Sequence, residues 1–254
     1  MNKQDIQKII NWIKNYFNKN SFAKGVVIGM SGGKDSFVVA KLCVEALGKD
    51  NVLGIIMPNG EMPDKNDAIV SCDILGIKYV SINIGNIYKS VINNTKNVLS
   101  NFNKTITDVS IINTAPRIRM TMLYSIAGSL GYLVANTSNL SESMVGYTTK
   151  WGDNVGDFAP IANFTKSEVC EIGNILGLPD YLVNKTPSDG LSGKSDEDKM
   201  GLKYANLDEY IRTGIKKEDF TQIEKMHKFS FHKRIGVIKY VNDYPNYFNN
   251  EENE

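Results

Sequence analysis

The chain has 254 residues, of which 42% are hydrophobic and 22% are charged, and its formal net charge is only +1. This length allows one large α/β domain or two small ones, and the composition is that of an ordinary globular protein. The balanced charge, without any block of Lys or Arg, argues against a nucleic-acid partner. No run approaches the ~18 apolar residues of a membrane span and the N-terminus has no signal-type stretch, so we expect a cytoplasmic protein with no membrane contact.

Strand and helix patterns alternate through the first half of the chain. An amphipathic helix is predicted over residues 3–19, where isoleucines recur on one stripe. The strand-like runs that follow are Val26–Met30, Val52–Met57, Lys78–Ile84 and Tyr132–Asn136, and the helical patterns between them are Ser36–Leu47, Asp64–Leu75, Ile87–Leu99 and Pro116–Leu130. This alternation predicts an α/β fold with a doubly wound, mainly parallel sheet flanked by helices. Ligands of such sheets bind beyond the carboxyl ends of the strands.

The second half of the chain changes character after residue 140. A capped helix is predicted over Lys166–Leu176 and a last helix over Ser195–Arg212, with a polar, glycine-rich stretch between them. Residues 248–254 are acidic and rich in Asn, and we expect them to be frayed. No repeat or linker divides the chain, so we predict one domain over residues 1–254. The three cysteines form no C-x-x-C pair, which favours reduced core thiols over a zinc or redox site.

The turn after the first predicted strand, Gly29–Ser36 with the sequence GMSGGKDS, carries the strongest functional signal. Adjacent glycines let the backbone approach an anion, and the following helix directs free N–H groups and partial positive charge at it. Lys34, in a first helical turn, opposes the helix dipole unless an anion lies there. The residue order excludes both the P-loop and the dinucleotide fingerprint. We interpret the turn as a pyrophosphate-binding loop, and the alternative is an ordinary glycine-rich turn.

The hexapeptide SGGKDS resembles the signature of the N-type ATP pyrophosphatase superfamily, whose members split ATP into AMP and pyrophosphate. Further blocks, in order along roughly residues 25–235, resemble NAD synthetase. These blocks are Ala115–Met120, Asn136–Glu142, Gly146–Asp153, Thr165–Glu168, Pro187–Leu191, Ser195–Asp198 and His232–Arg234. The resemblance implies an adenine-nucleotide α-hydrolase-like, Rossmann-like fold.

The same resemblance implies an ATP-dependent amidation of deamido-NAD, the last step of NAD biosynthesis. The nicotinate carboxylate attacks the α-phosphate of ATP, pyrophosphate leaves, and ammonia converts the NAD-adenylate into NAD and AMP. The protein's main contribution is then alignment and charge neutralisation. A magnesium ion and a homodimer are implied as well. Only 28 residues precede Gly29 and none of them is a cysteine nucleophile, so free ammonia rather than glutamine is the expected nitrogen donor.

The resemblance also assigns roles to individual residues. The positions that match ATP contacts are Gly29, Met30, Ser31, Gly32, Gly33, Lys34, Asp35, Ser36, Thr137, Lys166 and Ser188. The positions that match deamido-NAD contacts are Arg117, Lys150, Asp157, His232 and Lys233. Asp35 and Glu142 match the Mg²⁺ ligands, which suits a hard ion completed by phosphate oxygens and water. Asp35, Lys34 and Lys166 are expected to be catalytic, together with Asp153.

Some of these residues have structural alternatives. The pattern Asn139–Glu142 is also a capping box, which by itself would account for Glu142. Thr165–Glu168 is a second capping box, and there we favour the structural role. Arg119 fits a solvated charge as well as a ligand contact, and Asp153 fits a turn former as well as an ammonia-site residue. For His227 we expect no role beyond that of a surface residue.

Other features leave the function or its details open. Family members often carry an arginine near the end of the second strand, whereas Ile55–Gly60 has none, so the adenine contact is expected to be rearranged. Residues 187–197 are predicted to form a lid that closes over both substrates.

The apolar stripes of residues 3–19 and 120–126 suit either a dimer interface or the core of the monomer. The rival functions are another ATP-pyrophosphatase ligase, of GMP-synthetase or tRNA-thiolating type, and a non-catalytic adenine-nucleotide sensor.

Overall fold

A four-stranded parallel sheet lies at the centre of the computed structural model, which describes residues 1–185 and 195–240. The strand order is β3 (Lys78–Ser81), β2 (Val52–Ile56), β1 (Val26–Gly29) and β4 (Leu133–Val134). Val26 pairs with Val52 on one side and with Leu133 on the other. The chain order reverses between β1 and β4, so the carboxyl ends of these two strands flank the crevice in which such sheets bind ligands.

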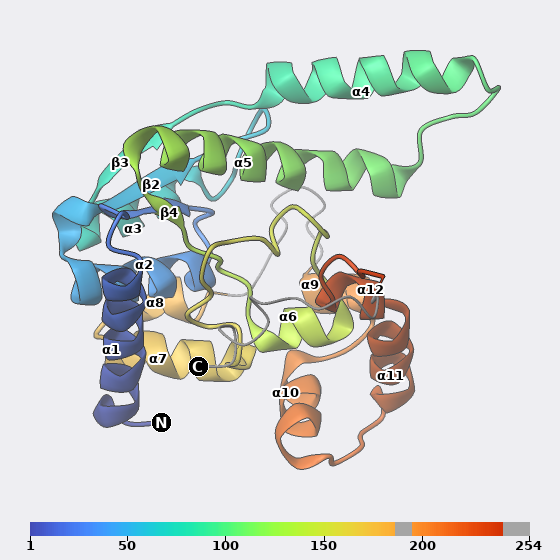
Figure 1. Ribbon diagram of the computed structural model, residues 1–254. Helices are drawn as coiled ribbons and strands as arrows, with labels where there is room; N and C mark the ends of the chain where they lie inside the picture. The colour runs from blue at the N-terminus through green and yellow to red at the C-terminus, as the bar shows by residue number, and fades with distance from the viewer. Residues whose placement is uncertain (186–194, 241–254) are drawn as a thin grey trace.

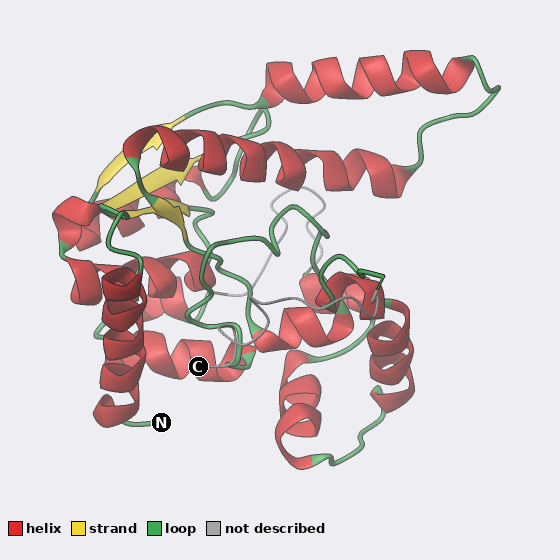
Figure 2. Cartoon of the chain, viewed as in Figure 1, coloured by secondary structure: helices red, strands yellow, loops and turns green. Residues whose placement is uncertain are grey.

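Helices cover both faces of the sheet (Figure 2). Alternate side chains of β1 point to opposite faces: Val26 and Ile28 enter the larger core, while Val27 enters a second core. The larger core includes α1 (Lys3–Lys19), α2 (Lys34–Leu47), α3 (Lys65–Leu75) and α7 (Lys166–Ile175), and the second includes α4 (Gly85–Ser100) and α5 (Asp108–Leu130). The predicted α/β fold with a parallel sheet is therefore confirmed.

The first predicted helix is α1, and its apolar stripe is used inside the monomer. The stripe residues that reach the larger core are Ile6, Ile9, Ile10, Ile13 and Phe17. Asn2 and Asp5 form a capping box at the start of this helix. Within the Met-rich segment of α5, Met122, Leu123 and Ile126 pack against the second core. The α1 stripe is thus buried within the monomer, whereas the α5 residues are only partly buried there.

The helices α4 and α5 form an arm that projects beyond the sheet (Figure 1). The predicted start of α5 at Pro116 is wrong, because Thr107 caps the helix further upstream by accepting a 3.3 Å hydrogen bond from the backbone N–H of Ser110. Pro116 consequently lies inside the helix. The end of the arm exposes several apolar side chains, with 58–69% of each accessible: Val98, Phe102, Val109 and Ile112.

Short helices make up most of the rest of the described chain. A third core includes residues of α6 (Leu140–Val145), α9 (Asp196–Met200), α10 (Tyr204–Thr213) and α11 (Phe220–Phe229). The other short helices are η1 (Lys49–Asn51), α8 (Asp180–Val183), which packs in the larger core, and α12 (Phe231–Arg234). The single helix predicted over Ser195–Arg212 is wrong, because Gly201 has a φ of +66° and ends α9. The strands predicted over 78–84 and 132–136 end sooner, at Ser81 and Val134.

Some predictions lie outside the described residues, namely the frayed tail 248–254, Ser188 and all but the last three residues of the lid 187–197. Across residues 1–185 and 195–240, no helix is long and apolar enough to cross a membrane. The three cysteines are free thiols: Cys43 and Cys72 are buried, and Cys170 is half-buried.

Candidate active site

The turn between β1 and α2 has the backbone geometry of an anion-binding loop. Gly32 has a φ of +78°, and a Cβ atom there would lie 2.3 Å from the carbonyl oxygen of Asp64, so a larger residue does not fit. Gly33 caps α2 without a side-chain hydrogen bond, which leaves the N–H groups of the first helical turn available to an anion. The hydroxyl oxygens of Ser31 and Ser36 lie 3.2 Å apart and shape the turn from within.

A buried lysine joins acidic side chains beside this turn. Lys166 begins α7, and its Nζ lies 3.1 Å from Oε1 of Glu142 and 3.7 Å from Oδ2 of Asp196. Asn139 connects Glu142 to a third acid, Asp35: its Nδ2 donates to Oδ1 of Asp35 at 3.2 Å, and its Oδ1 accepts from the backbone N–H of Glu142 at 3.0 Å. We call Asp35, Glu142, Asp196 and Lys166 the acid–lysine cluster. Four helices therefore converge on one charged centre.

The electrostatics of the acid–lysine cluster favour an added cation. Burial, reinforced by the charge of Asp35, raises the pKa of Glu142 to about 7. Burial also raises the pKa of Asp35, against the opposing effect of Lys166 and Lys34. Burial alone would lower the pKa of Lys166, but the neighbouring carboxylates outweigh it and the pKa is raised. Two carboxylates that resist ionisation together are the kind of pair that a divalent cation stabilises.

The protein side chains at this centre fit Mg²⁺ only if a bound phosphate compound and water supply further oxygen ligands. In the described part of the chain, no group of three or more His, Cys, Asp and Glu side chains is arranged to hold a metal. Asp35 and Glu142 would therefore contribute two ligands, and phosphate oxygens and water the rest. That division is usual for Mg²⁺, which keeps several waters and binds through one or two carboxylates and substrate phosphates.

The two capping-box patterns have different outcomes. Thr165 and Glu168 form the complete box at the start of α7, as predicted. Asn139 caps α6, but the carboxylate of Glu142 pairs with Lys166. Helix capping by itself therefore does not account for Glu142.

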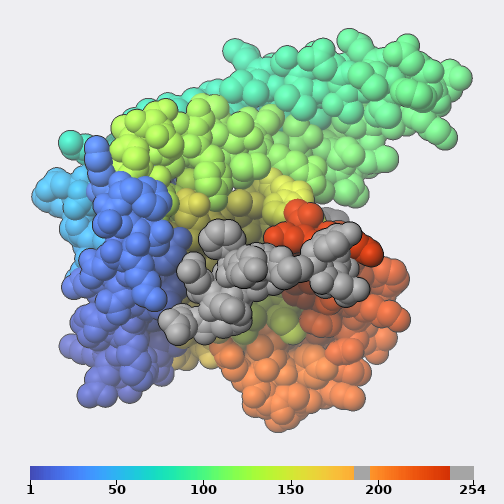
Figure 3. All heavy atoms as spheres, in the orientation of Figure 1, coloured from blue at the N-terminus to red at the C-terminus, as the bar shows by residue number. Residues whose placement is uncertain are grey.

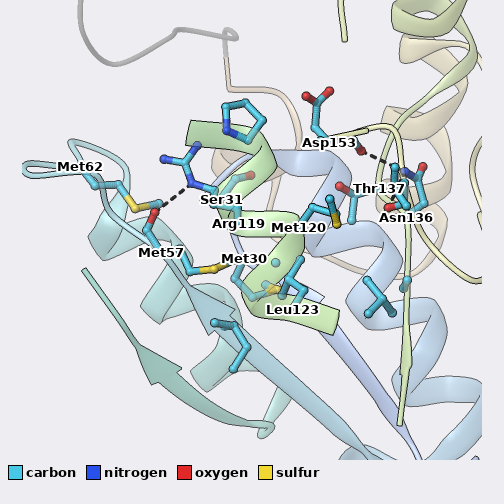
Figure 4. Close-up of a pocket in the computed structure, with 17 residues that line it drawn as sticks. Met30, Ser31, Met57, Met62, Arg119, Met120, Leu123, Asn136, Thr137 and Asp153 are labelled. Carbon is cyan, nitrogen blue, oxygen red and sulfur yellow. Dashed lines mark hydrogen bonds between the residues drawn. The ribbon is translucent and has the colours of Figure 1, made fainter. Parts of the chain in front are cut away.

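An apolar cavity of about 280 Å³ opens at the carboxyl ends of β1, β2 and β4 (Figure 4). Four methionines line it, Met30, Met57, Met62 and Met120, next to Ser31 of the glycine-rich turn and Thr137 after β4. Arg119 reaches in from α5, and its Nε donates a 3.0 Å hydrogen bond to the backbone carbonyl of Met57. Burial lowers the pKa of this guanidinium, while Asp153 opposes the effect. Arg119 is thus no solvated surface charge, and it brings a cation to the end of the second strand.

A second cavity adjoins the first, and Asn136 lines both. Three residues matched to deamido-NAD contacts are linked to one another through backbone carbonyls. Nε of Arg117 donates to the carbonyl of Lys150 at 3.2 Å, and Nζ of Lys150 donates to the carbonyl of His232 at 2.6 Å. Lys233 lines this cavity, with its Nζ bonded to the carbonyls of Gly146 and Thr148.

Asp157 and Asp153 both have local structural bonds. Asp157 lines the second cavity, and its Oδ2 accepts a 2.7 Å hydrogen bond from the backbone N–H of Val134. Asp153 lines the first cavity, and its Oδ1 accepts from the backbone N–H of Thr149 at 2.9 Å. Burial raises the pKa of Asp153. Asp153 therefore stabilises its turn and also faces the cavity, so the two alternatives from the sequence are compatible.

Several site features lay beyond sequence reasoning. Tyr204 packs against Lys166, whose Nζ lies 3.9 Å from the ring centroid. Nζ of Lys34 lies 3.3 Å from Sγ of Cys170, far along the chain. Asp196 had a signal, since it falls in a block that resembles the family. His227 is half-buried and its Nδ1 lies 2.8 Å from the carbonyl of Met144, so the prediction of a plain surface residue is wrong.

The profile of one family, NAD synthase, matches residues 5–243. This chain belongs to the NAD synthase family. It is 40% identical over 250 residues to the NH(3)-dependent NAD(+) synthetase of Pyrococcus furiosus, covering 92% of this chain and 94% of that one. Its structure resembles the NMN synthetase of Francisella tularensis, with a TM-score of 0.84, 32% identity, and 95% and 98% of the two chains covered.

Another solved structure of a NAD synthase relative also matches nearly the whole fold. It is the NH3-dependent NAD synthetase of Campylobacter jejuni, with a TM-score of 0.75, 30% identity, and 95% and 100% of the two chains covered. The family identified by resemblance from the sequence is confirmed, and so is the α/β architecture that it implied.

Proposed function

We propose that this protein is an ammonia-dependent NAD synthetase, which converts deamido-NAD, ATP and ammonia into NAD, AMP and pyrophosphate through an NAD-adenylate. One observation carries the proposal. The phosphate-binding turn, the acid–lysine cluster and the apolar cavity meet at the carboxyl edge of the sheet. Membership of the NAD synthase family and the names of the relatives support this function over the rival ligases and the nucleotide sensor.

The chemistry of the first step requires charge neutralisation on ATP. The N-terminus of α2, Lys34 and Lys166 supply positive charge, and the apolar cavity suits the adenine ring, with Arg119 and Thr137 at its wall. Asp35 and Glu142 would hold Mg²⁺, which when bound neutralises charge on the phosphates. In this proposal the N-terminus of α2, Lys34 and Lys166 hold the phosphates so that the α-phosphate faces the attacking carboxylate.

The second cavity is proposed to take the deamido-NAD. Lys233 lines this cavity, and hydrogen bonds link Lys150 and Arg117 to the adjoining His232, so cationic side chains gather here as two bridging phosphates require. Asp153 lines the first cavity, and we expect its carboxylate to attract ammonium and to position ammonia. Free thiols throughout suit a reducing compartment, and we place the enzyme in the cytoplasm.

We also propose a homodimer that forms through the α4–α5 arm. The arm forms a ridge along the top of the molecule (Figure 3), and its end exposes Val98, Phe102, Val109 and Ile112. Contiguous exposed apolar side chains usually mark an interaction surface. Light scattering of the active enzyme should give about 57 kDa, twice the 28.3 kDa of one chain. A value near one chain would refute the dimer.

The activity test uses purified protein with Mg²⁺, ATP, ammonium and one acceptor at a time. Deamido-NAD should yield NAD and AMP in equal amounts, and Lys166→Met should abolish both products. Nicotinate mononucleotide is the informative competitor, because a structural relative is named an NMN synthetase. A higher kcat/KM with the mononucleotide would replace our proposal with that second function. Glutamine supplied alone should be unproductive, and an equal rate with glutamine would refute ammonia as the donor.

A further inference from the structure

Tyr204 has a buried hydroxyl group without a partner. It is the first residue of α10, only 6% of it is exposed, and its hydroxyl makes no hydrogen bond within the described residues. Burying a hydroxyl without a hydrogen bond is unfavourable, so tyrosine at such a position calls for an explanation beyond packing. The backbone N–H of Tyr204 is held by Oε1 of Glu197 at 2.7 Å, which fixes where the side chain starts.

The Tyr204 side chain faces the acid–lysine cluster. Nζ of Lys166 lies over its ring, 3.9 Å from the centroid, so the ring helps to hold this ammonium by a cation–π contact. Burial raises the pKa of the Tyr204 hydroxyl, and the charges of Glu142 and Asp196 raise it further. The hydroxyl therefore keeps its proton and remains a donor.

None of the carboxylates of the cluster accepts a hydrogen bond from the Tyr204 hydroxyl. Oε1 of Glu142 pairs with Lys166, Oδ1 of Asp196 accepts from Tyr147 at 3.1 Å, and Oδ1 of Asp35 accepts from Asn139. The acceptor that Tyr204 lacks is thus more simply supplied by a ligand than by the protein. Lys166 supplies positive charge at this point, and a triphosphate would bring its own Mg²⁺ to the carboxylates around it.

We propose that Tyr204 is a phosphate-binding residue, whose hydroxyl donates a hydrogen bond to an oxygen of the triphosphate and of the pyrophosphate that leaves from it. Its ring at the same time keeps Lys166 in place for that ligand. The inference deepens the proposed function, on which it rests for the identity of the phosphate compound.

The test compares Tyr204→Phe with wild type and with Tyr210→Phe. Phenylalanine keeps the ring over Lys166 and removes one oxygen atom. Tyr210 lies on the same helix, but its hydroxyl donates to Oε1 of Glu224 at 2.6 Å and lies away from the cluster, so it is a matched control. Three ligands are titrated with Mg²⁺ present: ATP, inorganic pyrophosphate and adenosine. Binding is followed by calorimetry and thermal denaturation, and kinetics by AMP formation.

Tyr204→Phe should weaken binding of ATP and pyrophosphate by about tenfold or more, because a hydrogen bond to a charged oxygen is lost, and leave adenosine binding unchanged. Its melting temperature without ligand should equal or exceed that of wild type, since no protein hydrogen bond disappears. Tyr210→Phe should show the reverse, with a slightly lower melting temperature and unchanged pyrophosphate binding.

Two results would overturn the inference. One is unchanged affinity for ATP and pyrophosphate in Tyr204→Phe, and the other is a large fall in its melting temperature without ligand, which would make the hydroxyl a structural group. The binding measurements need no turnover. If wild type makes no NAD yet binds pyrophosphate through Tyr204, the proposed function fails and this inference stands.

Discussion

Replacing Glu142 by glutamine separates the proposed metal-ligand role of this residue from a structural role. Only 18% of its side chain is accessible, and burial raises its pKa from 4.5 to about 7. That difference corresponds to roughly 3 kcal/mol against the ionised form in the folded protein. A carboxyl with a raised pKa stabilises the fold fully below its unfolded pKa, and this contribution is lost as the pH rises through about 7. Glutamine removes the charge and can still accept a hydrogen bond from Lys166.

Glu142→Gln should therefore melt at the same temperature as wild type near pH 4 and several degrees higher above pH 7, without ligand. Its turnover with Mg²⁺ should fall by about a hundredfold or more, and added Mg²⁺ and ATP should stabilise it less. Thermal denaturation between pH 4 and 8 and an assay of AMP release measure both effects.

Glu168→Gln provides the matched control. Although burial acts in the opposite direction, the hydrogen bonds from Arg212 and Thr165 lower the pKa of Glu168. A lowered carboxyl pKa stabilises the fold above the unfolded pKa, so this variant should lose stability at neutral pH and keep its rate. If Glu142→Gln behaves like Glu168→Gln, with lower stability and an unchanged rate, the metal-ligand argument is refuted.

Three further predictions test the cavity, the turn and the arm. Arg119→Met should raise the KM for ATP by about tenfold with little change in melting temperature, because the guanidinium lines the cavity. An unchanged KM would mean that Arg119 serves only to bind the backbone carbonyl of Met57. Gly32→Ala should abolish ATP binding in calorimetry, because its Cβ would collide with the carbonyl of Asp64 at a φ of +78°. The double variant Phe102→Ser and Ile112→Ser should give monomers by light scattering. Dimers that persist in this variant would show that the interface does not lie at the end of the arm.

Features with a short-range cause could be predicted from the sequence. The strand–turn–helix unit around SGGKDS is specified by β-branched residues, two glycines and an apolar helix pattern that adjoin one another, and the structure contains it. The capping box Thr165–Glu168 spans one helical turn and is present as predicted. Two helix predictions were wrong. The helix predicted to start at Pro116 begins earlier because Thr107 caps it, and the single helix predicted over Ser195–Arg212 is interrupted because Gly201 adopts a left-handed conformation.

The sequence by itself determined the alternation that makes a parallel sheet, the glycine-rich strand–turn–helix unit and, by resemblance, the family. Only the tertiary structure decided which side chains meet. Lys166 pairs with Glu142, Arg119 reaches the backbone of Met57, and the ring of Tyr204 lies beneath Lys166. The physical reason is that these contacts join segments far apart along the chain. Their distances depend on how the sheet and its helices pack, and no local pattern of residue types encodes that packing.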